Sequence, residues 1–171
     1  MTTSFNSWLK KCLFFAILAL PVAMLAQSAK AEKILNKADL YYQANDKIRS
    51  QELYLEVLEL DENNFRASYQ LGKINKFFKN YREAARYFRK ASEIDPDREP
   101  EVFLQIGLTY KILGNYRKAK EAFEDFKKRN KDPNSEEFKR AELEIEGCNL
   151  ADSLLKRKPN WQGKSASFNS A

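Results

Sequence analysis

Histidine is absent from the 171 residues, and the chain has only two cysteines, five glycines and five prolines. Without histidine it lacks the commonest general base, the commonest zinc ligand and any histidine-based triad. The scarcity of glycine and proline disfavours an all-β fold, which needs many turns. No Gly-rich phosphate loop, nucleophile elbow or metal-ligand spacing occurs. We therefore expect no catalytic residue, no metal and no cofactor, and predict that the protein is not an enzyme.

The two cysteines are Cys12 and Cys148. Cys12 lies in a leader that we expect to be removed, so the mature chain has one thiol and cannot form an internal disulfide. The helical pattern around Cys148 predicts a small buried apolar residue. An intermolecular or redox role is the alternative.

The net charge of the chain is small, and basic and acidic residues are evenly interleaved along it. Lysine and arginine total 30 against 24 acidic residues, a net charge of +6 that falls to about +4 without the two leader lysines. Such an excess does not demand nucleic acid as a partner. The 43% apolar and 32% charged fractions are typical of one folded helical domain.

The first 28 residues have the pattern of a secretory signal peptide. A polar start ending in Lys10 and Lys11 precedes an apolar run at 12–26, followed by small residues. Cleavage after Ala26 or Ser28 fits best, and Ala31 is a third candidate. The run is shorter than the roughly 20 residues of a membrane span, so an uncleaved anchor is the alternative. We expect an exported protein of the periplasm, either free or associated with the outer membrane or peptidoglycan.

Residues 31–133 divide into three similar units, at 31–64, 65–98 and 100–133. Small residues and aromatic residues recur in them at steps of 34 and 35 residues. The small residues are Ala38, Gly72 and Gly107, then Ser50, Ala84 and Ala119; the aromatic residues are Tyr54, Phe88 and Phe123. A repeat of this length predicts stacked supersecondary units.

Each unit has the pattern of two amphipathic helices joined by a tight turn, with apolar residues such as Leu71 and Ile74 at helical spacing. The turns fall at 45–46, 79–80 and 114–115, where Asn and Gly tolerate the left-handed residue that ends a helix. Gly72 and Ala84 are expected to let two helix axes approach closely. The residues expected to fill the gap to the neighbouring unit are Tyr87, Phe88 and Phe123.

This order of small and aromatic residues resembles the tetratricopeptide repeat over residues 31–133. The resemblance implies an all-α fold, a right-handed superhelical array of three helical hairpins. The first unit departs from the pattern: Lys47 stands where an aromatic residue is usual, Ser50 replaces alanine and Glu62 replaces the closing proline. In the third unit Phe126 replaces a small residue, so packing against the next segment must differ there.

Residues 135–157 are predicted to form a capping helix. Ser135 is placed to cap its N-terminus, and the apolar residues that follow predict one broad apolar face. Such a helix should cover the last core and turn a polar face outward. Residues 158–171 have little to bury and are predicted to be a flexible tail or linker.

The resemblance implies that a partner binds along a concave surface lined by the first helix of each unit. The residues expected to contact the partner are Tyr42, Arg66, Tyr69, Lys73, Lys76, Phe77, Leu104, Leu108 and Lys111, with Asp39, Gln105 and Ile112 beside them. This mixture suits an amphipathic or acidic segment, with aromatic anchors and lysines that attract it.

Other interpretations of these residues stay open. Phe77, Leu108 and Ile112 fit a core between repeats as well as a groove, and Lys73 and Lys76 fit a solvated face. Some family members clamp a terminal carboxylate with an Asn and Lys set, and this chain has Asp39 and Lys73 at the comparable places. The basic runs at 127–129 and 156–158 lie at the C-terminal ends of helices, where positive charges interact favourably with the helix dipole. Weak attraction of these runs to the anionic cell envelope is the alternative.

A second resemblance concerns residues 141–151 and the tail at 167–171. These segments, with the leader and the short array, are similar to the N-terminal part of Bacteroidetes envelope proteins in which repeats precede a β-propeller and an OmpA-like domain. Some of those proteins serve type IX secretion. The sequence therefore predicts a non-catalytic scaffold that binds a protein or peptide. The alternative is that this chain is a fragment, the N-terminal interaction arm of a larger peptidoglycan- or outer-membrane-associated protein.

Overall fold

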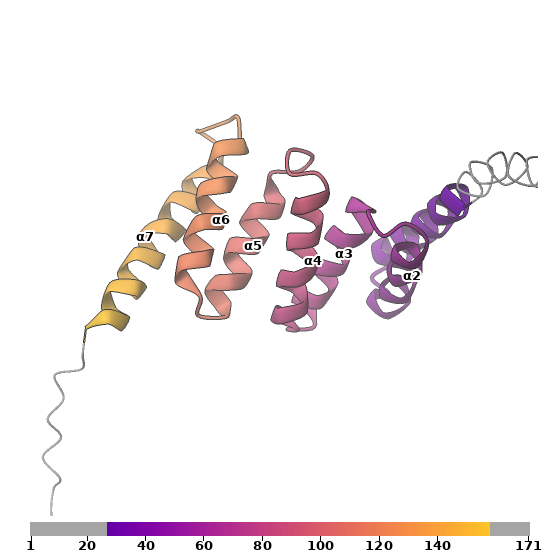
Figure 1. The fold of residues 1–171 in the computed structure, drawn as a ribbon, viewed down its shortest axis with the longest axis horizontal. Coiled ribbons are helices and arrows are strands. Elements are labelled where there is room, and N and C mark those ends of the chain that lie inside the picture. The colour runs from indigo at the N-terminus through magenta and orange to yellow at the C-terminus, as the bar shows by residue number, and fades with distance from the viewer. Residues whose placement is uncertain (1–26, 158–171) are drawn as a thin grey trace, which may run out of the picture.

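The chain folds as a row of antiparallel helices, each packed on the next (Figure 1). The computed structural model describes residues 27–157, and every regular element within that range is a helix. Residues 27–43 are helical. The six helices that follow are α2 (Lys47–Leu60), α3 (Phe65–Phe77), α4 (Tyr81–Ile94), α5 (Glu101–Ile112), α6 (Tyr116–Arg129) and α7 (Glu136–Lys156). The prediction of an all-α superhelical array of hairpins is confirmed.

The predicted leader and tail lie outside the described residues, except for positions 27 and 28, which are helical. The Gln27 side chain donates a hydrogen bond of 2.9 Å to the Leu60 carbonyl. Ala31, the third candidate for leader cleavage, is 3% exposed and belongs to the core. None of the described helices is both long and apolar enough to cross a membrane.

Helix ends are fixed by short-range signals in the sequence. The three turns within hairpins each have a residue with a positive φ: Asn45 at 63°, Lys79 at 61° and Gly114 at 72°. Four helices begin with a side-chain oxygen that accepts a backbone N–H, which satisfies a donor that the helix leaves unpaired. These residues are Asp46, Asn64, Asn115 and Ser135, with distances of 3.0 to 3.2 Å.

The second and third hairpins close through a phenylalanine ring packed on a glycine. A Cβ atom added at Gly72 would lie 2.5 Å from Phe88, and one added at Gly107 would lie 2.4 Å from Phe123. Both rings are fully buried. The glycines therefore make room for a ring from the other helix of the same hairpin. The sequence pattern predicts instead that these rings fill the gap to the neighbouring unit.

Helix α7 departs from the prediction of one broad apolar face. Its inner side buries Ala141 and Cys148 in the cluster that also contains Phe126, which confirms that Cys148 is a buried apolar residue. Ile145 packs against the same cluster, but four leucines face outward instead. They are Leu143, Leu150, Leu154 and Leu155, each between 53% and 72% exposed. The predicted polar outer face is wrong, because apolar residues occupy opposite sides of this helix.

Candidate functional site

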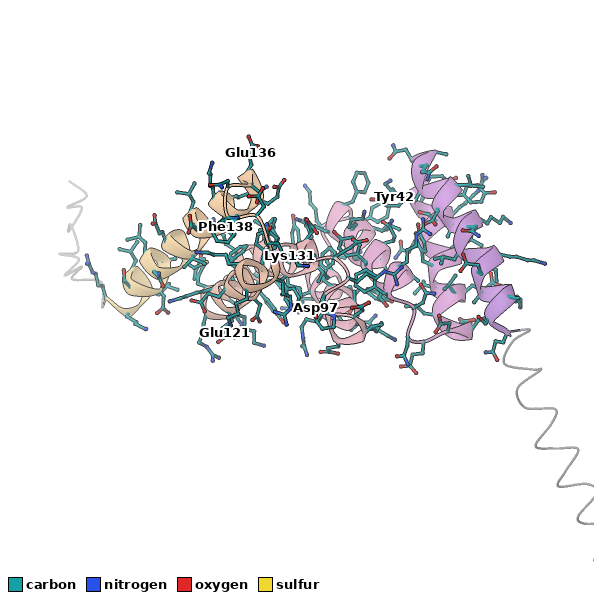
Figure 2. The ribbon with its side chains drawn as sticks, turned by 90° about the horizontal axis from the view of Figure 1, so that it is seen from above. Tyr42, Asp97, Glu121, Lys131, Glu136 and Phe138 are labelled. Atoms are coloured by element: carbon teal, nitrogen blue, oxygen red, sulfur yellow. The ribbon has the colours of Figure 1, made fainter. Side chains whose placement is uncertain are left out.

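The candidate site is the surface made by the first helix of each hairpin, which we call the first-helix face. It is formed by residues 27–43, α3 and α5, and by the adjoining side of α7. In Figure 2, Tyr42 of this face and Glu121 of α6 lie on opposite sides of the array. The helical spacing of the predicted residues places them here, since positions three and four apart share one side of a helix.

Lys73 lies between two tyrosine rings. Its Nζ is 5.1 Å from the ring centre of Tyr42 and 5.0 Å from that of Tyr69, so one ammonium group contacts the aromatic faces of two neighbouring repeats. Among the described residues no carboxylate forms an ion pair with it, although Glu99 and Asp39 act on it from farther away. Burial lowers the pKa of Lys73. An anion from a partner would therefore meet a cation that is positioned but not neutralised.

The aromatic residues around Lys73 form a continuous group. The rings of Tyr69 and Phe65 stack at 5.9 Å, and Tyr69 also contacts the Phe88 ring at 5.8 Å. Burial, with the nearby Glu99 and Glu101, raises the pKa of Tyr69 to about 12. Tyr69 is thus held by the core on one side and presented to the surface on the other.

Lys47 is a site residue that sequence analysis missed. Its Nζ lies 3.6 Å from the Tyr42 ring centre and donates a hydrogen bond of 3.0 Å to the Tyr42 carbonyl. Lys47 begins α2, a second helix, and reaches the first-helix face only because the tight turn at Asn45 folds it back. The only signal in the sequence was its departure from the aromatic residue that is usual there.

The other two lysines of the face have partners within the chain. Lys76 donates a hydrogen bond of 2.7 Å to the side-chain oxygen of Gln105, and burial, with Arg140 nearby, lowers its pKa. Lys111 forms an ion pair with Glu144 of α7. Of these three lysines, Lys111 has an ion pair within the described residues, whereas Lys73 and Lys76 have none.

Two apolar side chains project from the face at equivalent positions of successive repeats. Phe77 is 62% exposed and Ile112 is 51% exposed, so neither belongs to a core between repeats. Phe77 also contacts Phe78 edge-on at 5.3 Å. Leu108 is half-buried and packs against the core. Phe77 and Ile112 are thus exposed on the face, whereas Leu108 belongs in part to the core.

Two predicted residues do not offer a free side chain. Leu104 is 4% exposed and belongs to the buried cluster that includes Ala141 and Cys148, so its prediction as a contact residue is corrected. Its position corresponds to Tyr69, but leucine is too short to reach beyond the core. Arg66 forms an ion pair of 2.8 Å with the buried Asp39, which accepts a hydrogen bond of 2.6 Å from the Tyr54 hydroxyl.

Two further features concern metal binding and the basic run at 127–129. No group of histidine, cysteine, aspartate or glutamate within residues 27–157 could hold a metal ion. The basic run at 127–129 is engaged in ion pairs with Glu142, Asp125 and Asp97. These pairs agree with a role in docking α7 and in stabilising the end of α6.

The tetratricopeptide-repeat model matches residues 29–64, 65–98 and 100–133, which is more than half of the chain. The protein belongs to the tetratricopeptide-repeat family. A search of curated protein sequences gave no match.

Several solved structures have the same fold. The Yersinia enterocolitica chaperone SycD, in complex with a peptide of the translocator YopD, has 18% identity and a TM-score of 0.62, with 72% of this chain and 95% of that chain covered. PcrH of Pseudomonas aeruginosa, in complex with the chaperone-binding region of PopD, has 19% identity, a TM-score of 0.64 and coverage of 73% and 95%. The first repeat domain of Spaghetti, bound to the HSP90 peptide SRMEEVD, has 17% identity, a TM-score of 0.62 and coverage of 73% and 94%.

Proposed function

We propose that this protein is a non-catalytic scaffold that binds a segment of another protein across the first-helix face. The observation that carries the proposal is Lys73, which lies between Tyr42 and Tyr69 without an ion pair, close in sequence to the exposed Phe77. A carboxylate on the partner would neutralise Lys73, while apolar side chains would cover Phe77 and Ile112. The partner is thus an amphipathic segment with at least one acidic residue. The peptide complexes of structural neighbours support this kind of partner.

The test is partner capture from the native organism with a variant of the face. Reversing the charge of Lys73 and Lys76 together with Tyr69→Ala should abolish capture of the protein that the wild type retains. The matched control is R117E/K128E, which reverses two exposed charges on α6. Circular dichroism must show that both variants stay helical. If the first variant is folded and still captures the partner unchanged, the binding site does not lie on this face.

Export to the periplasm is part of the same proposal. Its support is the charged start and the apolar run at 12–26, which lie outside the described residues. An immunoblot of fractionated native cells, with antibody against residues 32–158, tests it. A soluble periplasmic band near the size of the mature chain supports a free scaffold, and a band in the cytoplasm contradicts export.

A second candidate function is the interaction arm of a larger envelope protein, associated with the peptidoglycan or outer membrane. The outward leucines of α7 favour it, because a helix that ended the fold would expose polar residues there. In the same immunoblot, a much larger band in the envelope fraction would support this candidate. A band at the size of the mature chain would exclude it.

A further inference from the structure

A groove of about 810 Å³ runs along α4, away from the first-helix face. At one end it is lined by Glu62 and Asn63, in the turn between α2 and α3, and at the other by Tyr110 and Leu113, at the end of α5. Between them lie the α4 side chains of four cationic residues, Arg82, Arg86, Arg89 and Lys90, with Ala85, Glu93 and Ile94. A volume of this size is within the range of ligand-binding sites.

The groove is basic. Arg82, Arg86 and Arg89 lie on one side of α4 at spacings of four and three residues, and Lys90 is beside them. The only lining carboxylates are Glu62 and Glu93, so the lining residues sum to two positive charges. Apolar contact is available beneath the arginines, from Ala85, Ile94, Tyr110 and Leu113.

The arginines retain unused donors. Arg89 forms a hydrogen bond of 3.2 Å to Glu93 through one terminal nitrogen, and Arg86 contacts Glu83 at 2.8 Å. Arg82 forms no ion pair with any residue between 27 and 157. Each guanidinium has five N–H donors, so these pairs orient the side chains and leave further donors for a second carboxylate. The Arg86 guanidinium is also held over the Tyr87 ring, 4.1 Å from its centre.

The repeat provides an internal comparison that separates binding from folding. The positions equivalent to Arg86 are Glu52 in α2 and Glu121 in α6, and those equivalent to Lys90 are Glu56 and Asp125. The same hairpin therefore folds with acidic residues at these outward positions. Packing therefore does not require cations at positions 86 and 90, while the position equivalent to Arg82 is Ile48 in α2 and Arg117 in α6.

We propose that the α4 groove is a second docking site, which binds an acidic helical segment of a partner protein. Carboxylates spaced three and four residues apart on that segment would face Arg82, Arg86 and Arg89. Its apolar side chains would contact Tyr110 and Leu113. Charge complementarity selects this partner, because the groove lining has a net positive charge, whereas the equivalents of Arg86 and Lys90 are acidic in both α2 and α6. The protein can thus hold two segments at once, one on each side of the array.

The test uses a fluorescein-labelled helical peptide with glutamates at positions i, i+4 and i+7, and a matched peptide with glutamines there. Fluorescence anisotropy with the purified protein should show binding of the glutamate peptide only, weakening with salt. R86E/R89E should weaken binding by about tenfold or more, since two positioned charges are reversed. R117E/K128E, with the same net change on α6, and K73E/K76E, on the first-helix face, should change it less than about twofold.

Three results would overturn the proposal. Equal weakening by R86E/R89E and R117E/K128E would show attraction to overall charge instead of a site. Loss of binding in K73E/K76E alone would place the peptide on the first-helix face. Sedimentation that shows a dimer, dissociated by R86E/R89E and unaffected by the peptide, would make the occupant a second copy of this chain. If R86E/R89E loses helicity, R86Q/R89Q replaces it and should still weaken binding measurably more than R117Q/K128Q.

Discussion

The first hairpin and the two that follow it have the same backbone plan but are closed by different chemistry. In the second and third, a buried phenylalanine ring packs on Gly72 or Gly107 of the facing helix. In the first, Ala38 replaces the glycine, and the buried Tyr54 donates a hydrogen bond of 2.6 Å from its hydroxyl to Asp39. Asp39 also forms an ion pair with Arg66 of the next repeat.

The three hairpins therefore share a backbone arrangement but not the type of side-chain contact that closes them. Apolar contact closes the inner hairpins, which have neighbours on both sides. The first hairpin uses a polar group that reaches the first-helix face, since Arg66 is half-exposed there. The contact that closes it is therefore sensitive to charge and pH, while the ring-on-glycine contacts of the other two are apolar.

The largest effect is expected from Gly72→Ala. The new Cβ would lie 2.5 Å from the fully buried ring of Phe88, so either the ring must shift within the core or the two helices must move apart. We expect a loss of about 2–3 kcal/mol in the free energy of unfolding, measured by urea denaturation. Gly107→Ala should behave in the same way.

Gly147→Ala is the matched control for that substitution. Gly147 is exposed in the middle of α7, with nothing within 4 Å of an added Cβ. Alanine there should stabilise the protein by about 0.5–1 kcal/mol, since it only removes backbone freedom of the unfolded chain. A Gly72→Ala protein as stable as Gly147→Ala would refute the ring-on-glycine account.

Tyr54→Phe breaks the corresponding contact in the first hairpin. It removes the hydroxyl and leaves Asp39, 7% exposed, with Arg66 as its remaining partner. The expected loss is about 1–2 kcal/mol in the free energy of unfolding. Tyr81→Phe, at a half-exposed tyrosine, is the control and should change stability by less than about 0.5 kcal/mol. Equal effects would mean that the hydroxyl does not close the hairpin.

Alkaline pH should weaken the first hairpin and its junction with the second. Burial raises the pKa of Tyr54 and Tyr42, and that of Tyr69 to about 12, from an ordinary value of 10.0. The unfolded chain loses these protons first, so the stabilisation is complete below pH 10 and is lost as pH rises through 12. Tyrosine absorbance should show late titration of these residues. Hydrogen exchange at pH 10.5 should show that α2 opens before α6. The reverse order would contradict the difference between the first hairpin and the other two.

Lys73→Met should have the smallest effect on stability, and a favourable one. The folded-state pKa of Lys73 is below its ordinary value of 10.5 because burial disfavours the charged form. Removal of the charge should therefore raise the free energy of unfolding by up to about 1 kcal/mol at neutral pH, with a gain that shrinks as pH approaches 10.5. Partner binding should weaken at the same time. A destabilised Lys73→Met protein would show that Lys73 serves the fold.

Much of the fold could be predicted because the same pattern of small, aromatic and turn residues occurs in three units. Residues such as Gly72 and Gly107 recur in register, and the left-handed turn residues follow the same step. The direction of individual side chains was harder. Leu104 and Tyr69 hold equivalent positions, but only the longer tyrosine reaches the surface.

The sequence could not predict features that depend on how elements meet in space. Lys47 reaches the first-helix face from a second helix, and Glu144 of α7 neutralises Lys111. The outward leucines of α7 follow from which side of that helix packs on α6, and the sequence, with apolar residues on both sides, did not indicate that side. The groove along α4 needed side chains from α4, from the end of α5 and from the turn between α2 and α3.

The most direct test of the proposed function is photo-crosslinking from the first-helix face. A diazirine-bearing lysine analogue would replace Lys73 in one protein and Lys131, in the loop after α6, in another, each expressed in the native organism. The account predicts that one partner is crosslinked from position 73 and not from position 131, and that mass spectrometry finds an acidic, amphipathic segment at the crosslink. Equal crosslinking from both positions, or none from position 73 while the partner still co-purifies, would contradict it.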